Sequence, residues 1–245
     1  MKKAISQVVI ALGATAIALL LIGDMVLDLV VTRSVGHVGS KITGTDLTMD
    51  GANLFLLSGA GAIRNLDVGN PAGYSQFSAI QVGTINVGLK PGSVFSDTLQ
   101  ISHIRVCSPQ INFEGSVDTN NLAALLQNVE TALGNHLPGP GAEPPGKRLH
   151  VEDLLITGAK LNLAPSVLGG PPQILDLPDI HLTDLGAGTN SLSSAELTQM
   201  VLSRLSKEAI AALIEGLTNA SPRPAPNPTG PPLNEVKPRV SPNPS

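Results

Sequence analysis

Apolar positions in this chain repeat at a constant spacing of 50 residues. The segment Leu99–Phe113 (LQISHIRVCSPQINF) aligns with Leu149–Leu163 (LHVEDLLITGAKLNL), and Asn112 coincides with Asn162. The matching apolar positions are Leu99, Ile101, Ile104, Val106, Ile111 and Phe113 in the first copy and Leu149, Val151, Leu154, Ile156, Leu161 and Leu163 in the second. Apolar residues largely alternate with polar ones, as in half-buried strands. Each copy therefore predicts two strands, joined at Pro109 or at Gly158-Ala159.

The alternation changes phase within the first strand of each copy. The change falls between Ile101 and Ile104 and again between Val151 and Leu154. One extra residue in a strand of period two produces such a change, and its usual form is a β-bulge, which bends and twists the sheet. A similar change at Gly83, inside the strand expected over 79–89, suggests another irregularity.

Further strands are expected on both sides of the repeat. From Lys41 to Gly69 the pattern fits strands separated by glycine, with the sequences ITGTDLTMD, ANLFLLSG and AIRNLDVG. We interpret Gly59-Ala60-Gly61 as a hairpin turn, because the third glycine of a dinucleotide-binding fingerprint is missing. Asn70-Pro71-Ala72-Gly73 is a strong turn signal. After the second copy, Pro178 interrupts ILDLPDIHLTDLG, which predicts an edge or bent strand.

Two amphipathic helices complete the pattern. Asp118 or Thr119 is the expected N-cap of a helix over 120–133, and Ser193 or Ser194 is the expected N-cap of a second, longer helix. The apolar stripe of the second helix contains Leu197, Val201, Leu202, Leu205, Ile210, Leu213, Ile214 and Leu217. The proline- and glycine-rich segment 135–146 between the two copies is expected to be a loop.

Both ends of the chain are expected to lie outside this fold. Lys2 and Lys3 precede the uncharged run Ala4–Gly23, which is long enough to cross a bilayer as a helix. Acidic and β-branched residues follow Gly23 in place of a signal-peptidase site, so we predict an uncleaved anchor whose amino terminus is cytoplasmic. The Pro-rich segment 221–245 is expected to be a disordered, extended tail.

These patterns predict three parts: a membrane anchor with a juxtamembrane helix over 1–34, a β-rich domain over 35–220 and the tail over 221–245. The fold class expected is α+β. An N-terminal transmembrane helix is followed by a twisted, bulged and mainly antiparallel β-sheet on which two amphipathic helices pack.

Composition narrows the possible functions. Aromatic residues make up 2% of the chain, charged residues 14%, and the net charge is −4. Without a basic patch or rings for base stacking, the chain is not expected to bind nucleic acid. Cys107 is the one cysteine, so no internal disulfide is expected, and we interpret it as a small buried residue of a strand.

No group of residues predicts catalysis. The five histidines form no HExxH motif, and no serine lies in G-x-S-x-G. The most concentrated polar group is Asp176, Asp179, His181 and Asp184. A divalent metal is one interpretation, and the favoured one is a solvent-facing set that alternates with Leu177, Ile180 and Leu182. We therefore predict no catalytic residue, no cofactor and no metal.

The order of these features resembles the AsmA-like family of bacterial envelope proteins, in particular its short members with a single anchor. The resemblance covers about Met1–Leu217. It is carried by KITGTDLTMDGANLFLLSGAGAIRNLDVGNPAGY, then LQISHIRVCSPQINFEG followed by NLAALLQNV, and finally LPDIHLTDLG with its helix. It implies a twisted sheet held at the bacterial inner membrane by a single pass, with most of the chain in the periplasm. Larger relatives are implicated in outer-membrane biogenesis and in moving phospholipid along a hydrophobic β-groove.

The expectation is therefore a non-enzymatic envelope protein, with two alternatives for how it contributes to envelope and outer-membrane maintenance. In the first, an apolar β-groove contacts or transfers lipid through phospholipid acyl chains. In the second, the protein is a structural scaffold that binds envelope proteins through its sheet edge or its Pro-rich tail. The sequence names neither the lipid nor the partner.

Overall fold

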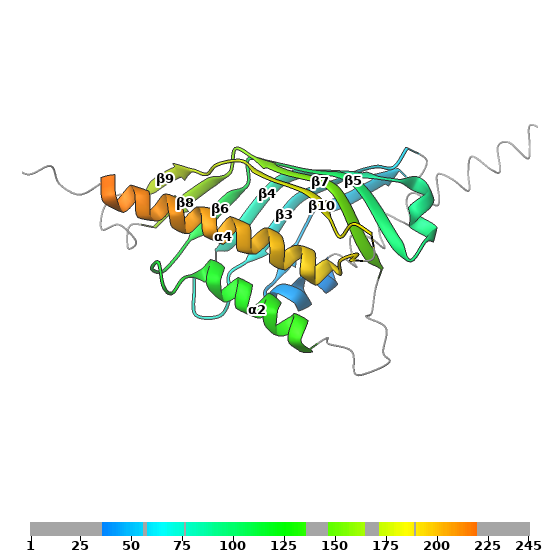
Figure 1. Cartoon of the computed structure of the whole chain (residues 1–245). Coiled ribbons are helices and arrows are strands. Elements are labelled where there is room, and N and C mark those ends of the chain that lie inside the picture. Colours follow the sequence, from blue (N-terminus) through cyan, green and yellow to red (C-terminus); the bar gives the residue numbers. More distant parts are fainter. Residues whose placement is uncertain are drawn as a thin grey trace, which may run out of the picture.

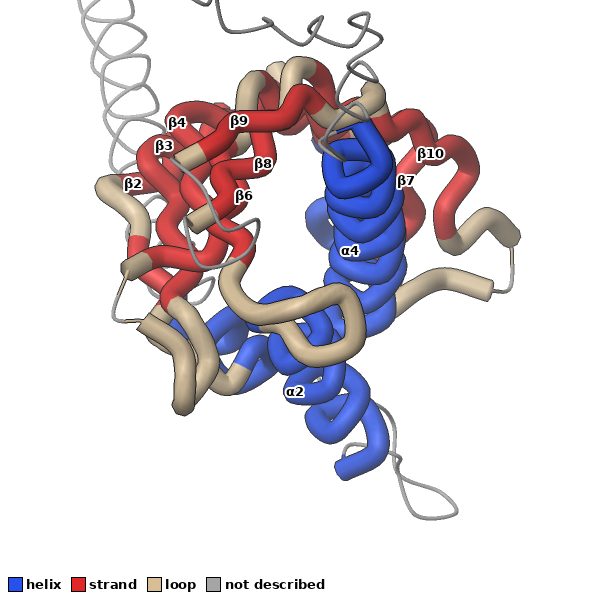
Figure 2. Tube along the Cα trace, turned by 90° about the vertical axis from the view of Figure 1, so that its left-hand side faces the viewer, coloured by secondary structure: helices blue, strands red, loops and turns tan. Residues whose placement is uncertain are grey.

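The protein is an α+β structure built on one curled, mixed β-sheet (Figure 1). This computed structural model describes residues 36–55, 58–75, 77–135, 147–164, 172–188 and 190–219. Two long helices, α2 (Asn121–Asn135) and α4 (Ser194–Asn219), lie on the hollow side of the sheet, as Figure 2 shows. The predicted anchor over 1–31 and the predicted tail over 221–245 lie outside the described residues.

The strands of the described residues form a single ten-stranded sheet. Their bounds are β1 (Leu47–Thr48), β2 (Gly51–Phe55), β3 (Ala60–Gly69), β4 (Ser78–Leu89), β5 (Thr98–Cys107), β6 (Gln110–Phe113), β7 (Arg148–Thr157), β8 (Lys160–Leu163), β9 (Gln173–Asp176) and β10 (Ile180–Leu185). A short 3₁₀ helix, η1 (Pro91–Phe95), connects β4 to β5.

Strand β4 is the centre of the sheet. It pairs with β3 along one side, while its other side pairs with β6 at Ile80 and Gln81 and with β5 from Ile85 to Leu89. Beyond β5 lie β7 and then β10, and beyond β6 lie β8 and then β9. The short strands β1 and β2 both pair with β3. One edge of the sheet is therefore made by β9 and β10 and the other by β1 and β2.

The two copies of the repeat lie side by side as parallel neighbours. Strand β5 pairs with β7 and β6 pairs with β8, always between residues 50 apart, such as Ile101 with Val151 and Ile111 with Leu161. Helix α2 lies between the copies in the sequence, as a parallel connection requires. The other strand pairs are antiparallel. The sheet is thus mixed, although most of its pairs agree with the expected antiparallel arrangement.

The predicted bulge between Ile101 and Ile104 is confirmed. Leu89 pairs with Ile101 and Gly88 with His103, so Ser102 is the extra residue of β5. The offset of 50 between β5 and β7 is the same before and after this point, so β7 contains a matching irregularity at residues 152–153. Opposite it in β10, Asp184 has a left-handed φ of 52°.

A second line of irregular backbone separates each long strand from its continuation. Ser108 and Gly158, which are equivalent in the two copies, have left-handed φ angles of 50° and 61°. Asn65 in β3 has a φ of 48°, and the ladders on both sides of β4 omit the predicted position Gly83. Bulges of this kind increase twist and bend the strands, which explains the curl of the sheet in Figure 2.

Cys107 is exposed, and the prediction of a buried thiol is wrong. Its neighbour Val106 packs against the core. Because successive side chains in a strand point to opposite faces, Cys107 lies on the outer face at the end of β5.

The core fills the space between the hollow face of the sheet and the two helices. The repeat supplies Ile111, Phe113, Val151 and Leu161, and each of these side chains is at most 1% exposed. The helices contribute Leu122, Leu125 and Val129 from α2 and Leu202, Leu205, Ala209 and Leu213 from α4. Aliphatic residues make up most of this core, as the low aromatic content predicts.

The N-cap of α4 agrees with the prediction, and that of α2 does not. Ser193 Oγ accepts from the backbone N–H of Glu196, whose carboxylate accepts from the N–H of Ser193, which is a capping box. In α2 the cap is Asn120 in place of Asp118 or Thr119, because Asn120 Oδ1 accepts from the N–H of Ala123 at 2.8 Å. The amide of Asn120 also donates to the carbonyl oxygens of Ser116 and Val117, which fixes the chain that enters the helix.

The strand predicted over 42–50 is wrong in most of its length. Residues 36–43 are helical, and only Leu47–Thr48 pairs with the sheet. Side chain to backbone bonds favour the helix: Thr43 Oγ1 donates to the carbonyl of Gly39, and Ser40 Oγ accepts from the N–H of Leu47. This third helical segment also covers the sheet, where two helices were expected.

The remaining turn and edge predictions are confirmed. Gly59 lies in the turn of the β2–β3 hairpin, where its N–H donates to the carbonyl of Phe55 at 2.8 Å. The N–H of Tyr74 donates to the carbonyl of Pro71 in the predicted turn. Pro178 separates β9 from β10, which lie on the same sheet edge but pair with different strands.

Candidate functional site

An open groove of about 900 Å³ lies at the end of the sheet where β4 begins and β6 and β8 end. Its walls come from the loop that precedes β4, from the two copies of the repeat and from the segment after β6. The lining residues are Gly73, Tyr74, Ser75, Phe77, Ser78, Gln81, Asn112, Phe113, Glu114, Gly115, Asn162, Leu163 and Ala164. The volume lies within the range of small-molecule sites.

The two asparagines that coincide in the repeat form part of the groove wall. Asn162 Nδ2 donates to Asn112 Oδ1 at 2.9 Å, and Asn112 Nδ2 donates to the carbonyl oxygen of Ser78 at 2.7 Å. The parallel register of β6 and β8 places the two side chains directly beside each other. The amides therefore link three strands of the sheet at the groove.

Glu114 binds the loop over 70–75 to the end of β6. Its carboxylate accepts from Asn70 Nδ2 at 2.8 Å, from the N–H of Ser75 at 2.9 Å and from the hydroxyl of Ser75. A carboxylate with three hydrogen bonds is a strong point of attachment. This is how the loop is held beside the groove.

Asn121, the first residue of α2, connects the helix to the same network. Its side chain is fully buried, with 0% exposure. Its Nδ2 donates to Asn70 Oδ1 at 2.8 Å and to the carbonyl of Asn112 at 2.7 Å, and its Oδ1 accepts from the N–H of Glu114. A buried amide with these partners has no polar atom without a hydrogen bond, so the helix start and the groove form one rigid unit.

The rim of the groove carries an aromatic ring in solvent. Phe77 is 76% exposed, although its backbone is held by neighbours on both sides. The N–H of Phe77 donates to Ser75 Oγ at 3.3 Å, and Ser78 Oγ donates to Asp67 Oδ2 at 2.6 Å. Gln81 Nε2 donates to the same carboxylate oxygen of Asp67 at 3.0 Å.

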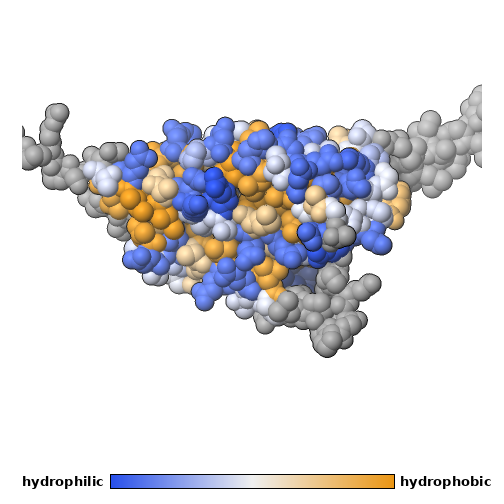
Figure 3. Space-filling view, in the orientation of Figure 1, coloured by the Kyte–Doolittle hydropathy of each residue, from blue (hydrophilic) through white to orange (hydrophobic). Residues whose placement is uncertain are grey.

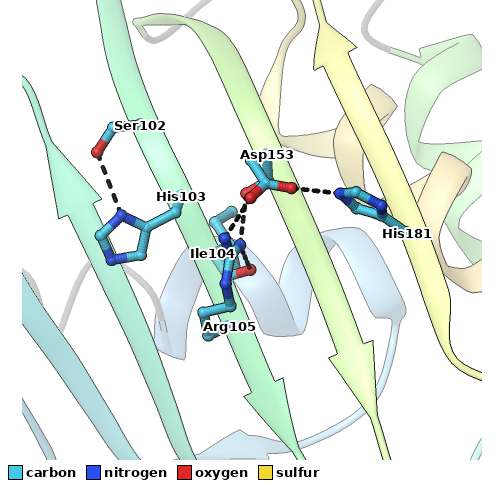
Figure 4. Close-up of polar contacts among 6 residues, drawn as sticks. All are labelled: Ser102, His103, Ile104, Arg105, Asp153 and His181. Carbon is cyan, nitrogen blue, oxygen red and sulfur yellow. Dashed lines mark hydrogen bonds and ion pairs between the residues drawn. The ribbon is translucent and has the colours of Figure 1, made fainter.

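A second polar group lies on the outer face of the sheet, away from the helices (Figure 4). Asp153 accepts from Arg105 on the neighbouring strand and contacts His181 of β10, with 2.6 Å between Asp153 Oδ1 and His181 Nε2. The hydrogen bond from Arg105, followed by that from His181, holds the pKa of Asp153 below its ordinary range. Nearby, a hydrogen bond from Lys90 lowers the pKa of Glu152 in the same way. Arg105 and Asp153 thus form a surface ion pair between the neighbouring strands β5 and β7, whereas Lys90, which follows β4, reaches Glu152 of β7 across β5.

The structure does not bring the four predicted polar residues together. Asp176 binds Lys160 at 2.7 Å, Asp179 accepts from the N–H of Gly158, and His181 contacts Asp153. Asp184 occupies the left-handed position of β10. Among the residues that the structure describes, no three histidine, cysteine or carboxylate side chains are grouped in a way that could hold a metal ion.

The groove itself was not predicted from the sequence. It unites residues 73–81, 112–115 and 162–164, and no local motif connects these segments. The coincidence of Asn112 with Asn162 was the one available signal, because a polar residue conserved in both copies of an apolar repeat must lie on an outward position.

Comparison with known proteins gives no relative. No family model, no curated protein and no solved structure matches the chain. Within the described residues, no helix combines the length and the apolar character needed to cross a membrane. The class that the structure defines is an α+β protein with a curled mixed sheet and helices on its hollow side.

Proposed function

We propose that the chain is a non-enzymatic protein of the AsmA-like class that is anchored in the bacterial inner membrane by residues 1–31. Its periplasmic domain contributes to envelope maintenance as a structural scaffold that binds other envelope proteins. The proposal requires no catalytic group, cofactor or metal. It retains the second of the two alternatives drawn from the sequence.

The observation that carries the scaffold proposal is that helices already occupy the hollow face of the sheet. Side chains such as Ile111, Leu161 and Phe113 on that face are buried against α2 and α4. An acyl chain that entered this space would have to displace a helix and lose the packing of its core side chains, which typically contribute 2 kcal/mol or more each, on the order of magnitude of large-to-small substitutions. This leaves the sheet edge and the outer face for partners.

The edge made by β9 and β10 is suited to such binding. Strand β10 pairs with β7 and β9 with β8, so each strand has one side directed away from the sheet. Edge strands can add a strand from a partner through main-chain hydrogen bonds. The Pro-rich tail over 221–245 is a further candidate for partner binding.

A position-specific crosslinker tests the scaffold. A photoreactive residue at Thr183 in β10 is expected to crosslink a discrete envelope protein in intact cells. The matched control is Thr84 in the central strand β4, which is also exposed but lies away from the edge. Equal crosslinking from both positions, or none from Thr183, would contradict binding at this edge.

Lipid contact remains a second candidate, supported by exposed aliphatic side chains near the end of α4. Ile214 and Leu217 are 47% and 42% exposed. Figure 3 shows an apolar patch over this end of α4 and the neighbouring β9. Such a patch can contact acyl chains without opening the core.

Lipid analysis separates the second candidate from the first. Full-length protein is purified in detergent, and bound phospholipid is quantified by mass spectrometry. If the patch holds acyl chains, the double variant Ile214→Asp and Leu217→Asp should retain less lipid than Ser203→Asp, a control at an exposed polar position of the same helix. Equal retention by both variants would leave the scaffold as the function.

A further inference from the structure

We propose that the groove bounded by Phe77, Gln81, Asn112 and Asn162 is a binding site for a neutral saccharide chain. This site goes beyond the scaffold function, which rests on the free sides of β9 and β10 and not on the groove. The argument uses the aromatic ring at the rim, the neutral polar groups of the wall, and the charge and size of the groove.

Aromatic residues are rare in this chain, yet they are concentrated at the groove. The sequence contains one tyrosine and four phenylalanines, and three of these five residues, Tyr74, Phe77 and Phe113, line the groove, with Phe77 exposed and Phe113 buried. The Phe77 ring lies in solvent while its backbone is fixed by Ser75 and by the contact of Ser78 with Asp67. An exposed ring on a fixed backbone can offer its face to the C–H groups of a sugar ring.

The wall presents amides, which both donate and accept hydrogen bonds as sugar hydroxyl groups do. Asn162 uses Nδ2 to bind Asn112, and Gln81 uses Nε2 to bind Asp67 and Ser78. No hydrogen bond within the described residues reaches Asn162 Oδ1 or Gln81 Oε1. In each amide the Nδ2 or Nε2 group is hydrogen-bonded to the protein, which fixes the position of the oxygen. The two oxygens are therefore available to accept a hydrogen bond from a ligand or from water.

The charge of the groove excludes other ligand classes. Glu114 is the one charged side chain among the lining residues, and its carboxylate already accepts three hydrogen bonds from Asn70 and Ser75. A phosphate would find no positively charged side chain there and would be repelled by the carboxylate of Glu114. An acyl chain would remove water from the amides without replacing its hydrogen bonds, which is unfavourable. A ligand with apolar faces and many hydroxyl groups satisfies both parts of the groove.

The size and openness of the groove fit a chain of several sugar units. Its volume of about 900 Å³ exceeds what a single ring needs, and the groove is open to solvent. Phe113 and Leu163 alternate with the two asparagines and are buried in the core, so the amides of Asn112 and Asn162 are the side chains that face a ligand. A saccharide chain can therefore lie along the groove without a closed pocket around it.

Tyr74 provides a direct measurement. It is the single tyrosine in a chain without tryptophan, so tyrosine emission of the purified protein comes from the groove. Full-length protein in a polyoxyethylene detergent, which carries no sugar head group, is titrated with maltohexaose, cellohexaose and chitohexaose. We expect a saturable change in emission with at least one of these probes, confirmed by titration calorimetry.

Variants determine whether the groove is the site. Phe77→Ala and Asn162→Ala should each weaken binding by about tenfold or more, a difference in binding free energy of about 1.4 kcal/mol. The control Phe95→Ala removes a ring that is 88% exposed at the far end of β4, and it should bind like the parent chain. Thermal melting of each variant shows whether it remains folded.

Three results would overturn the proposal. The first is the lack of a saturable response to all three saccharides in both measurements. The second is equal binding by Phe77→Ala and Phe95→Ala. The third is binding of a fatty-acid probe in the groove in place of the saccharides. None of these results bears on crosslinking at Thr183, so the scaffold function and the saccharide site succeed or fail separately.

Discussion

Asn162 donates a hydrogen bond from its side-chain amide to the side chain of Asn112 at a distance of 2.9 Å, and the two residues are equivalent in the two copies of the repeat. The bond shows that the copies stack on each other as parallel neighbours. Repeat proteins gain stability from such contacts between adjacent units. Here the same pair also forms a wall of the groove.

Replacing Asn112 and Asn162 by alanine should lower the free energy of unfolding by different amounts, and the two effects should not be additive. Asn112→Ala loses the bond to Asn162 and the bond to the carbonyl of Ser78, so we expect it to destabilise the fold by about 1–3 kcal/mol. Asn162→Ala loses one bond and should cost about 1 kcal/mol. In urea unfolding of the full-length protein, the double variant should lose less stability than the sum of the two. Additive losses would show that the amides do not interact.

Leu154 tests the core of the second copy. It is 3% exposed and packs in the main cluster, so Leu154→Ala should destabilise the fold by about 2–5 kcal/mol, and Leu154→Asp should prevent folding. Its equivalent Ile104 is only partly buried, and Ile104→Ala should have a smaller effect. Circular dichroism on heating measures both changes.

His103 is the matched control for the core variants. It directly precedes Ile104, and its ring lies over Gly88 on the outer face of the sheet (Figure 4). We expect His103→Ala to change the free energy of unfolding by no more than about 0.5 kcal/mol. A loss as large as that of Leu154→Ala would mean that the bulge, and not the core, determines stability here.

The strands of the repeat, the bulge in β5 and the cap of α4 were predictable, because each depends on residues that are near one another in the sequence. The phase change between Ile101 and Ile104 indicates an extra residue, and the pair Ser193 and Glu196 specifies a helix start. The parallel contact between the copies was not predictable. Equal apolar patterns show that two strands share an environment, and they do not show that the strands pair.

The candidate site was harder to predict from the sequence than the fold. Its residues derive from three segments that meet only when β6, β8 and the loop before β4 reach the same end of the sheet. Local hydrogen bonds explain the errors at residues 42–50 and at the start of α2. Asn120 replaces Asp118 and Thr119 as the cap of α2 because its carbonyl oxygen and its amide group are both used there.

The free energy of unfolding should decrease at acidic pH as Glu196 becomes protonated. The hydrogen bond from the backbone N–H of Ser193 is the main cause that holds the pKa of Glu196 below its ordinary value. A carboxylate whose pKa is lowered by folding stabilises the protein above its unfolded-state pKa, and this contribution is lost as pH falls through the folded-state pKa. Near neutral pH, Glu196→Gln should therefore be less stable than the parent chain, and the difference should narrow below the ordinary glutamate pKa of about 4.3.

Urea unfolding at a series of pH values measures this effect. Glu215→Gln is the control, since Glu215 is an exposed carboxylate on the same helix and takes no part in the capping box. It should change the pH profile less than Glu196→Gln does. Parallel profiles for the parent chain and Glu196→Gln would show that the charge of the capping carboxylate contributes nothing.

Gly59 and Gly73 both have a left-handed backbone, and alanine substitutions at the two positions distinguish the cost of backbone strain from that of a steric clash. Gly59 has a φ of 71°, and a Cβ there would lie 2.0 Å from the carbonyl oxygen of Leu89. Gly73 has a φ of 95°, but a Cβ there would have no other atom within 4 Å. Gly73→Ala should therefore show the cost of the backbone conformation alone, about 1–2 kcal/mol. Gly59→Ala should cost more, because the hairpin must also move away from β4, where Leu89 donates to the carbonyl of Gly59 at 2.6 Å. Chemical denaturation of the two variants compares them directly, and equal losses would mean that the β2–β3 turn shifts freely and is not held against β4.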